Sequence, residues 1–575
     1  MTRGAETKTQ TARRFVGRVT LVSVFFVLLA TTLVARAVHL QVFNTEFLTH
    51  QADTRHLRTE IITAHRGTIT DRNGEPLAIS TPVDSVWANP KELALAEDKM
   101  PALARALGLD EQTLIRQITF SMNKDFVYLR RHLSPDKAAE VMSLKLPGVN
   151  VQREYRRYYP AGEVTGHLVG FTNIDDKGLE GLELAYNYWL AGESGAKRVL
   201  KDRMGRSVEN VESIRPPHHG KELRTSIDLR IQYVAYRALK AAIKSNNAES
   251  GSIVVLDTTT GEVLAIANQP TYNPNDRSQL IAERYRNRAI TDIFEPGSSI
   301  KPFVVAAALE SGDYRASSII DTSPGFVTVG AKTIEDSRNL GRISLTTILA
   351  RSSNVGATKV AMSLQADQLW NTMSHFGLGS MTASGFPGES QGTLTHHDHW
   401  KPISQATLAY GYGLSVTPLQ LAQAYAILGN HGQLQPVSLT ALEQAGEGTQ
   451  MVSKESAAAV LRMLEEVVRP GGTGTGAAVP GYRIAGKTGT SWKFAAGGYS
   501  KDKYISVFAG LAPASNPRLA AVVVIDEPSG ELYYGGDVAA PVFADIMSES
   551  LRLLAVPPDA LPAREPNSTM QAMSR

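Results

Sequence analysis

Three hydrophobic patterns follow one another along the chain, and the first is a long apolar run near the N-terminus. Between Arg18 and Arg36 lie 17 residues without a charge, VTLVSVFFVLLATTLVA. As a helix they span about 26 Å at 1.5 Å per residue. Apolar neighbours extend the run towards the ~30 Å of a hydrocarbon core, while the arginine side chains reach its surface. We therefore predict a membrane anchor at residues 18–40.

The charges before this run predict its orientation. Five basic residues precede or border it against one acid, Glu6, and such a segment stays in the cytoplasm. Residues 1–17 are therefore expected to be cytoplasmic, and the rest of the chain to lie across the membrane. A cleaved signal peptide is the alternative, because ARA at residues 35–37 resembles a cleavage site. The apolar run is longer than the usual stretch of about 7–15 residues in a signal, which favours the anchor.

The exported part has two further patterns. Residues 55–220 are charged and irregular, with turn signals such as DRNGEP, and from 221 helical and strand periods alternate. GSIVVLDTTTGEVLAIANQP predicts a β-hairpin, VTPLQLAQAYAILGNHG a helix, and YISVFAGLAPASNPRLAAVVVIDEP two late strands. We predict an α/β (α+β) domain at 221–556, whose mostly antiparallel sheet is assembled from both ends and flanked by helices. The aperiodic tail, 557–575, is predicted to be disordered.

Composition narrows the possible functions. Lys plus Arg number 59 against 56 Asp plus Glu, so no overall positive charge predicts a nucleic-acid partner. The chain has no cysteine, which excludes disulfides, thiolate catalysis and zinc–cysteine sites. The histidines of THHDHW (His396, His397 and His399) are compatible with a metal site, but a solvated loop is the favoured interpretation.

The sequence FEPGSSIKPF places Ser298 and Lys301 one turn apart where a helix is predicted to begin. A helix cap explains the serine, but a lysine is unfavourable at the positive end of a helix dipole. Ser-x-x-Lys alone is a weak signal, because it also occurs at four other serines: Ser121, Ser134, Ser194 and Ser500. Other motifs are needed to decide which of the five serines, if any, is catalytic.

A phosphate-loop pattern is the main competing signal. GYRIAGKT, residues 481–488, matches G-x-x-x-x-G-K-[ST], and VVVIDE resembles a magnesium-binding strand. A phosphate loop requires a strand before it and a helix at its lysine, whereas loop-like GGTGTGAAVP precedes this motif and glycine-rich sequence follows it. A membrane-anchored ATPase is therefore the less favoured alternative.

Three motifs in order give a stronger prediction. After Ser298 and Lys301 come Ser352 and Asn354, and then KTGT at 487–490 on a predicted strand. This order is the signature of penicillin-recognising serine acyltransferases. A serine hydroxyl needs a base within hydrogen-bond reach, and a lysine kept neutral by burial and a nearby cation serves as one.

The chemistry predicts a role for each member of this set. Ser298 is expected to be the nucleophile and Lys301 its base, with Lys487 lowering the protonation of Lys301. We expect Ser352 to relay a proton, and Asn354 to orient Lys301 and bind the substrate's peptide group.

The remaining predicted site residues lie on the late strand. Gly489 is expected to let substrate lie along the strand, and the hydroxyls of Thr488 and Thr490 to bind a carboxylate. The backbone N–H groups of Ser298 and Thr490 are the predicted oxyanion hole.

These motifs, with further blocks, make the chain resemble the class B penicillin-binding proteins, closest to the division-specific FtsI-type peptidoglycan D,D-transpeptidases. The further blocks are RGTITDRNGEPLA, RYYPAGEVTGHLVG, GLEGLE, AYGYGLSVTPLQLA and YYGGDVAAPVF. The resemblance implies an elongated pedestal, or dimerisation, module at 55–220 and a transpeptidase domain at 221–556. It implies cross-linking of stem peptides at the division septum through a serine acyl-enzyme, inhibition by β-lactams, and neither metal nor organic cofactor.

The resemblance also implies a location and partners. The expected location is the bacterial inner membrane, with the catalytic domain in the periplasm. The expected partners are stem peptides that supply the D-Ala-D-Ala donor and the amine acceptor, an FtsW-type membrane glycosyltransferase and other division proteins. A D,D-carboxypeptidase, a β-lactam sensor and a pure scaffold stay open as alternatives at this point.

Overall fold

The structure, a computed structural model, describes residues 5–45, 57–201, 207–276, 278, 281–495 and 498–560. It divides into two compact units, of which the first comprises 1–64, 83–154 and 193–218, and the second 65–82, 155–192 and 219–575. Segments before residue 220 and the whole chain after it therefore both contribute to the second unit. The predicted domain boundaries stay predictions, and most of the predicted tail, from 561 on, lies outside the described residues.

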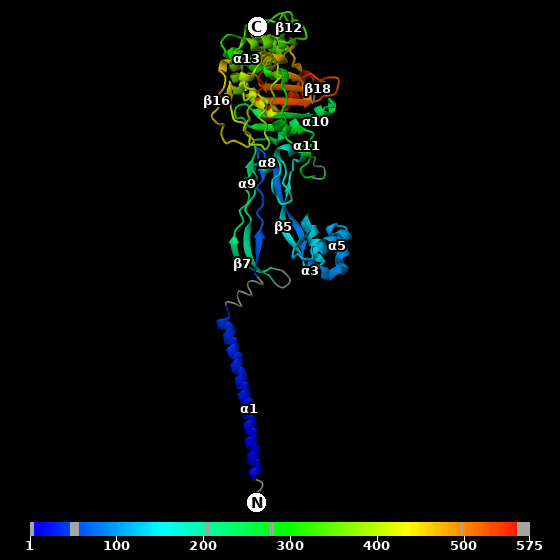
Figure 1. Ribbon diagram of the computed structural model, residues 1–575, viewed down its shortest axis with the longest axis vertical. Helices are drawn as coiled ribbons and strands as arrows, with labels where there is room; N and C mark the ends of the chain where they lie inside the picture. The colour runs from blue at the N-terminus through cyan, green and yellow to red at the C-terminus, as the bar shows by residue number, and fades with distance from the viewer. Residues whose placement is uncertain are drawn as a thin grey trace, which may run out of the picture. The chain divides into compact units, whose positions relative to one another are not determined.

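The N-terminal segment forms one long helix (Figure 1). Helix α1, Ala5–Val38, continues into the π-helical turn η1, His39–Phe43. The stretch Arg13–Phe43 is long and apolar enough to cross a membrane, and the predicted anchor lies inside it. Its threonines donate their hydroxyls to carbonyls four residues earlier, as Thr20 does to Val16 at 2.8 Å, so these polar groups need no water. The helix is compatible with a single membrane anchor.

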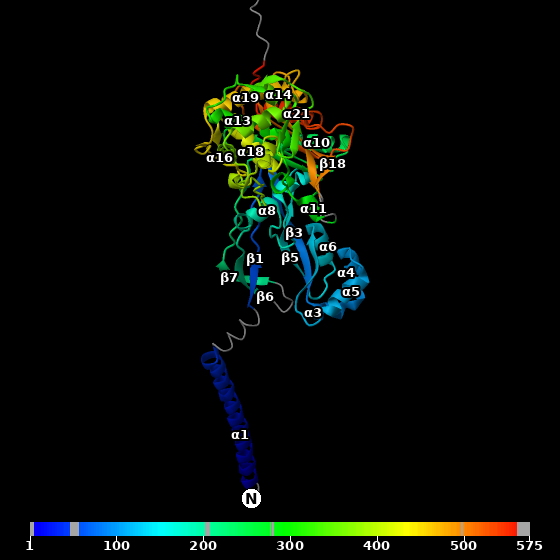
Figure 2. The ribbon, with the colours of Figure 1, turned by 45° about the horizontal axis from the view of Figure 1, so that its top comes forward.

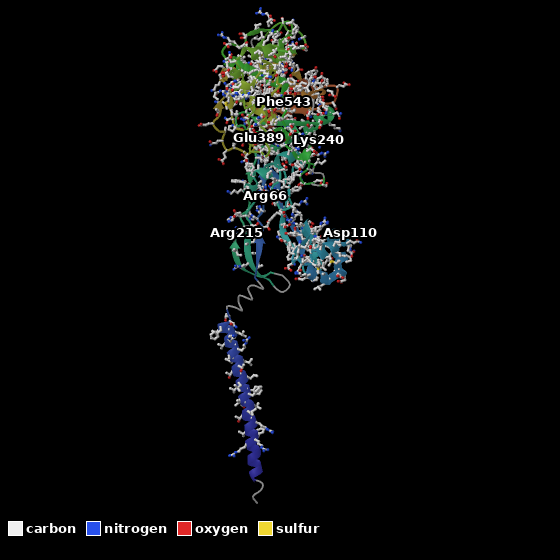
Figure 3. The ribbon with its side chains drawn as sticks, in the orientation of Figure 1. Arg66, Asp110, Arg215, Lys240, Glu389 and Phe543 are labelled. Atoms are coloured by element: carbon white, nitrogen blue, oxygen red, sulfur yellow. The ribbon has the colours of Figure 1, made fainter. Side chains whose placement is uncertain are left out.

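The first unit contains a small antiparallel sheet and a separate α/β cluster. The sheet has the order β1-β6-β7. Its strands are β1 (Leu57–Ile62), β6 (Gly195–Lys201) and β7 (Ser207–Arg215). The cluster's own elements are α3 (Pro90–Leu93), η2 (Ala94–Lys99), α4 (Met100–Leu107), α5 (Glu111–Phe120), β4 (Val127–Leu133) and α6 (Pro135–Ser143). Asp110 (Figure 3) caps α5 by accepting the Thr113 N–H at 3.0 Å.

In the second unit, three blocks singled out in the sequence meet in one buried ionic cluster. Glu183 accepts the Nε–H groups of Arg66 (Figure 3) at 2.5 Å and Arg157 at 2.6 Å, with all three side chains almost fully buried. Removing one partner from such a cluster leaves a buried charge and costs about 3–5 kcal/mol. The cluster explains why these distant blocks carry charged residues. The surrounding elements are β2 (Ile69–Thr70), η3 (Gly162–Val164), α7 (Gly166–Val169), α8 (Gly181–Ala185), α9 (Asn187–Leu190) and β8 (Leu223–Arg224).

Two long strands run from one unit into the other. They are β3, Pro76–Ala88, and β5, Val149–Tyr158, and they pair with each other.

The main sheet of the second unit has five antiparallel strands in the order β10-β9-β19-β18-β17. The first two come early in the domain and the other three come late, so the predicted sheet assembled from both ends is confirmed. The strands are β9 (Ser250–Asp257), β10 (Val263–Gln269), β17 (Ala485–Ala495), β18 (Gly498–Ala512) and β19 (Leu519–Asp526).

Helices cover both faces of this sheet (Figure 2). Alternate residues of a strand point to opposite faces, so Val522 belongs to the core that contains α18, and Val523 to the core that contains α10 and α21. On the second face Phe543 of α21 (Figure 3) packs against Phe508 of β18, with ring centroids 4.8 Å apart. These helices are α10 (Leu229–Ser245), α18 (Pro418–Gly429) and α21 (Ala540–Leu553).

The middle of the domain is mainly helical and lies on the α18 side. Its helices are α11 (Ala282–Tyr285), α12 (Arg288–Thr291), η4 (Gly297–Ile300), α13 (Lys301–Glu310), α14 (Leu345–Arg351), α15 (Asn354–Ser363), α16 (Ala366–His375), η5 (His397–His399), α17 (Pro402–Leu408) and α19 (Lys454–Val468). The later η6 (Thr475–Ala477) and α20 (Gly535–Val538) instead contribute to the core that contains α10 and α21. Its short strands are β11 (Ile319–Asp321), β12 (Phe326–Val329), β13 (Lys332–Glu335), β14 (Arg342–Ser344), β15 (Gln433–Leu434) and β16 (Thr449–Gln450). Helix α13 is buried on nearly all sides, and it follows the turn η4, which packs against the edge strand β17.

Candidate active site

Ser298 lies in η4, one turn of 3-10 helix directly before α13. The sequence indicated a helix that starts at the serine, whereas the α-helix begins at Lys301 and the serine makes no cap hydrogen bond to it. Gly297 has φ +55°, and a Cβ there would lie 3.0 Å from the carbonyl oxygen of Thr490. The turn is therefore pressed against β17, where the half-buried Ser298 side chain reaches a cavity.

Lys301 is fully buried behind this turn. Its Nζ lies 2.6 Å from the carbonyl oxygen of Ser352, 2.7 Å from Asn354 Oδ1 and 3.2 Å from Ser352 Oγ. Burial lowers the pKa of Lys301 well below its usual value, and the charge of Lys487 lowers it further, against a smaller opposing effect of Asp336. The arrangement favours a neutral amine, which can accept a proton.

The loop between α14 and α15 holds Ser352 and Asn354 in place. Ser352 ends α14 in the left-handed conformation with φ +58°, and Ser353 caps α15 by accepting the Gly356 N–H at 2.8 Å. The Asp336 carboxylate accepts the Ser353 hydroxyl and the Asn354 N–H, each at 2.5 Å. An acidic group at a helix N-terminus is stabilising, so Asp336 fixes the loop that contacts Lys301.

Lys487 reaches the same serine from the strand side. It is fully buried in β17, and its Nζ donates to Ser352 Oγ at 3.0 Å and to the Thr488 carbonyl oxygen at 3.1 Å. Burial lowers the pKa of Lys487 to about 7. Because this lysine lies inside a strand and not at a helix N-terminus, it cannot serve a phosphate loop.

The residues after Lys487 connect β17 to three neighbouring segments. The hydroxyls of Thr488 and Thr473 lie 2.9 Å apart, and Thr490 Oγ1 accepts the Gly535 N–H at 3.0 Å. A Cβ on Gly489 would lie 2.6 Å from the carbonyl oxygen of Pro296. The close approach at Gly489 is therefore to the loop that carries Ser298.

A cavity of about 650 Å³ opens over these groups. Five predicted site residues line it: Ser298, Ser352, Asn354, Thr488 and Thr490. The two lysines lie behind its wall, where their Nζ atoms contact Ser352. The structure thus brings together the three motifs that the sequence separates.

Known proteins match the chain over most of its length. The family described as penicillin binding protein transpeptidase domain matches residues 251–548, and the penicillin-binding protein dimerisation domain matches 61–225. Peptidoglycan D,D-transpeptidase FtsI of Escherichia coli K12 is 44% identical over 540 residues, 93% of this chain and 91% of that protein. The chain belongs to the class B penicillin-binding proteins.

Two further similar proteins support the same family assignment. Probable peptidoglycan D,D-transpeptidase PbpC of Pseudomonas aeruginosa is 43% identical over 544 residues, 95% of this chain and 96% of that protein. The solved structure of penicillin-binding protein 3 from Mycobacterium tuberculosis, complexed with aztreonam, is 28% identical with a TM-score of 0.68, over 87% of this chain and 98% of that one.

The activity of this class B penicillin-binding protein is that of an FtsI-type peptidoglycan D,D-transpeptidase, as the sequence predicted. Its substrates are peptidoglycan peptides, and β-lactams bind its transpeptidase domain. The competing interpretation as an ATPase is wrong.

Several residues at the site were not predicted. Asp336 stands in IEDSRN and Thr473 in GGTGTG, two loop-like stretches without a distinctive pattern. Arg351 directly precedes Ser352 and lines the cavity. Gly535 belongs to the block YYGGDVAAPVF, which marked the family but gave no role to this glycine. Of these unpredicted residues, only Gly535 lies in a block that the sequence had already singled out.

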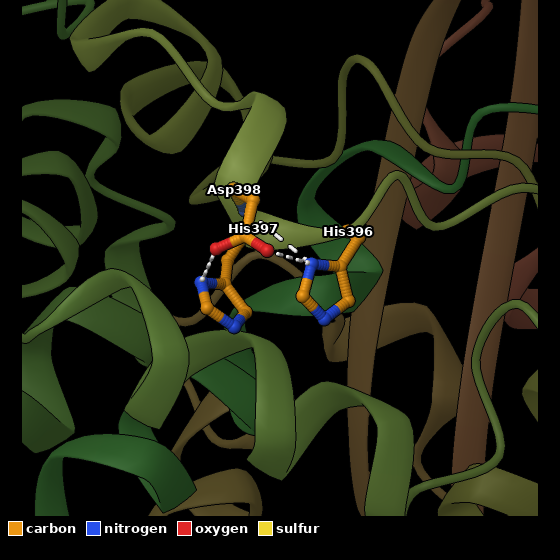
Figure 4. Close-up of side chains that lie close together, drawn as sticks. All are labelled: His396, His397 and Asp398. Atoms are coloured by element: carbon orange, nitrogen blue, oxygen red, sulfur yellow. Dashed lines mark hydrogen bonds and ion pairs between the residues drawn. The ribbon is translucent and has the colours of Figure 1, made fainter.

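The histidine cluster lies elsewhere in the domain. His396 and His397 turn their Nδ1 atoms towards the Asp398 carboxylate, at 3.2 and 3.4 Å (Figure 4). His396 and His399 are exposed and His397 is half-buried. Both imidazoles therefore contact the same carboxylate, and the predicted solvated loop stays a prediction.

Proposed function

We propose that Ser298 is the nucleophile of a two-step acyl transfer and that neutral Lys301 is its base. Lys301 Nζ takes the proton of the Ser298 hydroxyl as its Oγ attacks the carbonyl between two terminal D-alanines of a stem peptide. The bond to the last D-alanine breaks, its nitrogen receives a proton from the site, and D-alanine leaves. An amine of a second stem peptide then attacks the ester and frees the Ser298 hydroxyl.

The observation that carries this proposal is the environment of Lys301. A fully buried lysine beside a second lysine is costly in its charged form. The acceptors at 2.6 and 2.7 Å can take the two hydrogens of the neutral amine, which leaves its lone pair for a proton. Ser352 contacts both lysine Nζ atoms, which supports its assignment as the group that relays the proton towards the leaving nitrogen. Asn354 orients Lys301 through its side-chain oxygen.

Substrate binding is assigned to the edge strand. β17 ends the sheet order, so an extended peptide can add alongside it through main-chain hydrogen bonds. Thr488 and Thr490 line the cavity, and their hydroxyls are assigned to the substrate carboxylate. The N–H groups of Ser298 and Thr490 are assigned to the oxyanion, where one donor contributes about 3–4 kcal/mol.

The proposal is tested by the products formed from stem peptides. Full-length protein in detergent, given a pentapeptide donor and an amine acceptor, is expected to release one D-alanine for each cross-linked product. The Ser298→Ala variant is expected to release none. Release of D-alanine with water as the dominant acceptor would favour the carboxypeptidase alternative, and cross-linking by Ser298→Ala would exclude the proposed nucleophile.

The membrane orientation and the division partners are also part of the proposal. The basic residues before the anchor favour a cytoplasmic N-terminus, which leaves the catalytic domain in the periplasm. The similarity to FtsI favours action at the division septum with an FtsW-type glycosyltransferase and other division proteins.

A reporter that is active only outside the cytoplasm, fused after Arg575, is therefore expected to be active. The mature protein is expected to keep its original N-terminus, as read by N-terminal sequencing. A mature chain that begins at Val38 would show that the apolar run is a signal peptide.

A further inference from the structure

A second group of chemically active side chains lies outside the active-site cavity, in η5 and the residue before it. His396, His397 and Asp398 each offer one ligand atom, and these atoms lie within 4.8 Å of one another (Figure 4). Of the residues that the structure describes, these three are the one such group of His, Asp and Glu side chains. None of them lines the cavity at Ser298, so the proposed acyl transfer does not account for them.

The backbone of this turn is already ordered by its own hydrogen bonds. The His399 N–H donates to the His396 carbonyl oxygen at 3.1 Å, and the Trp400 N–H donates to that of His397 at 2.9 Å. The Trp400 indole N–H closes the turn by donating to the Thr395 carbonyl oxygen at 2.9 Å. A ligand of the three side chains therefore has little backbone left to order, which lowers the entropic cost of binding.

A tryptophan of α16 packs against both imidazoles. The ring centroid of Trp370 lies 4.7 Å from that of His396 and 5.8 Å from that of His397. The centroids of the two imidazoles are 4.2 Å apart. Side chains that are held by packing keep a binding site close to its working geometry. Both rings turn Nδ1 towards the Asp398 carboxylate in this arrangement (Figure 4).

The separations between the donors fit one divalent ion. His396 Nδ1 lies 3.2 Å from Asp398 Oδ2, and His397 Nδ1 lies 3.4 Å from Asp398 Oδ1. Two ligands bound to Zn²⁺ at about 2.0–2.1 Å in a tetrahedral arrangement lie about 3.3–3.4 Å apart. His396 Nδ1 also faces the Asp398 N–H, but at 3.5 Å this contact is too long to hold the lone pair.

Each of these contacts requires a cation. The lone pair of a bare Nδ1 repels a carboxylate oxygen, so either a proton or a metal ion lies between the two atoms. Imidazole nitrogen together with carboxylate oxygen suits Zn²⁺ and similar transition ions, whereas Mg²⁺ and Ca²⁺ prefer oxygen ligands alone. The side chains of His396 and Asp398 are 47% and 69% exposed, so water can reach the remaining coordination positions.

We propose that His396, His397 and Asp398 bind one Zn²⁺ ion, with water completing its coordination. Imidazole must be unprotonated at the nitrogen that binds a metal, so the ion takes the place of any proton between each ring and the carboxylate. The site is separate from the acyl transfer proposed at Ser298. Its variants are therefore expected to keep the wild-type rate of penicillin acylation.

Calorimetric titration with Zn²⁺ tests the site. Full-length protein without a histidine tag is titrated in detergent at fixed pH, and its affinity is compared with those of His397→Ala and Asp398→Asn. Loss of a hydrogen-bond partner of a ligand already costs about 10–100-fold in metal affinity. Loss of a ligand itself is therefore expected to weaken binding by more than about tenfold. X-ray absorption at the zinc edge, with one equivalent bound, is expected to show two imidazole ligands.

His399→Ala is the matched control, because His399 is exposed in the same turn and lies outside the group of three ligands. It is expected to bind Zn²⁺ as tightly as wild type. No binding by wild type, or an unchanged affinity in both His397→Ala and Asp398→Asn, would overturn the site. An equal loss in His399→Ala would overturn the assignment of the ligands. Labelling by fluorescent penicillin checks that each variant is folded.

Discussion

The Lys301→Arg variant is expected to lose acylation by a fluorescent penicillin, although it keeps a positive charge at the same position. An arginine stays protonated at any usable pH and cannot take the Ser298 proton. A general base contributes about 10²–10⁴-fold to a rate, so we expect the rate of labelling to fall by more than about 10²-fold. The measurement is the second-order rate of labelling on gels.

A second variant separates chemistry from folding. Because Lys301 is fully buried, Lys301→Met replaces its stem with an apolar side chain of similar length and removes the buried amine. We expect Lys301→Met to keep a cooperative melting transition and to lose acylation to the same extent. Either variant retaining a tenth of the wild-type rate, a loss of only about 1.4 kcal/mol in barrier, would exclude Lys301 as the base.

The Lys487→Ala variant is expected to slow penicillin acylation by about 10²-fold. That factor corresponds to about 2.7 kcal/mol of transition-state stabilisation, a reasonable value for a charge-assisted contact in a partly dry site. The lost contacts are those of Nζ with Ser352 Oγ at 3.0 Å and with Thr488 Oγ1 at 3.2 Å. The fluorescent-penicillin assay measures this rate.

The same variant is expected to change the pH dependence of acylation. The charge of Lys487 lowers the pKa of Lys301, so its removal raises that pKa, and water entering the vacated space raises it further. Lys301 acts in its neutral form, so the rising limb of the rate against pH should move to higher pH. A limb that moves to lower pH, with an unchanged maximal rate, would contradict the role given to Lys487. Lys493→Ala is the control, because Lys493 lies on the same strand but pairs with Asp526 and Glu527.

Local patterns were sufficient to predict much of the fold. The two apolar runs of GSIVVLDTTTGEVLAIANQP predicted β9 and β10, and the late apolar runs predicted β18 and β19, because an apolar run and the turn residues beside it are local to each segment. The sequence also predicted that Lys487 lies on a strand. Context decided this point, since the glycine-rich stretch after it has no helical face.

Contacts between segments that are distant in the sequence could not be predicted from these local patterns. Asp336 acts on a helix that begins at Asn354, and Thr473 reaches Thr488 through the fold and not through a motif. The role predicted for Gly489, to let substrate lie along the strand, stays a prediction. The contact that the sequence could not show is with Pro296 of the nucleophile loop, whose carbonyl oxygen would lie 2.6 Å from a Cβ on Gly489. The interleaving of segments between the two compact units likewise depends on pairings that no single stretch encodes.

The central claim is that Ser298 forms the acyl-enzyme, and the most direct measurement is to find the acylated residue. Full-length protein is treated with penicillin and digested, and the modified peptide is identified by mass spectrometry. We expect one mass-shifted peptide, with the penicilloyl group on Ser298, and no such peptide from Ser298→Ala. A penicilloyl group on Ser121, Ser134, Ser194 or Ser500 instead, or equally rapid modification of the alanine variant, would contradict the account.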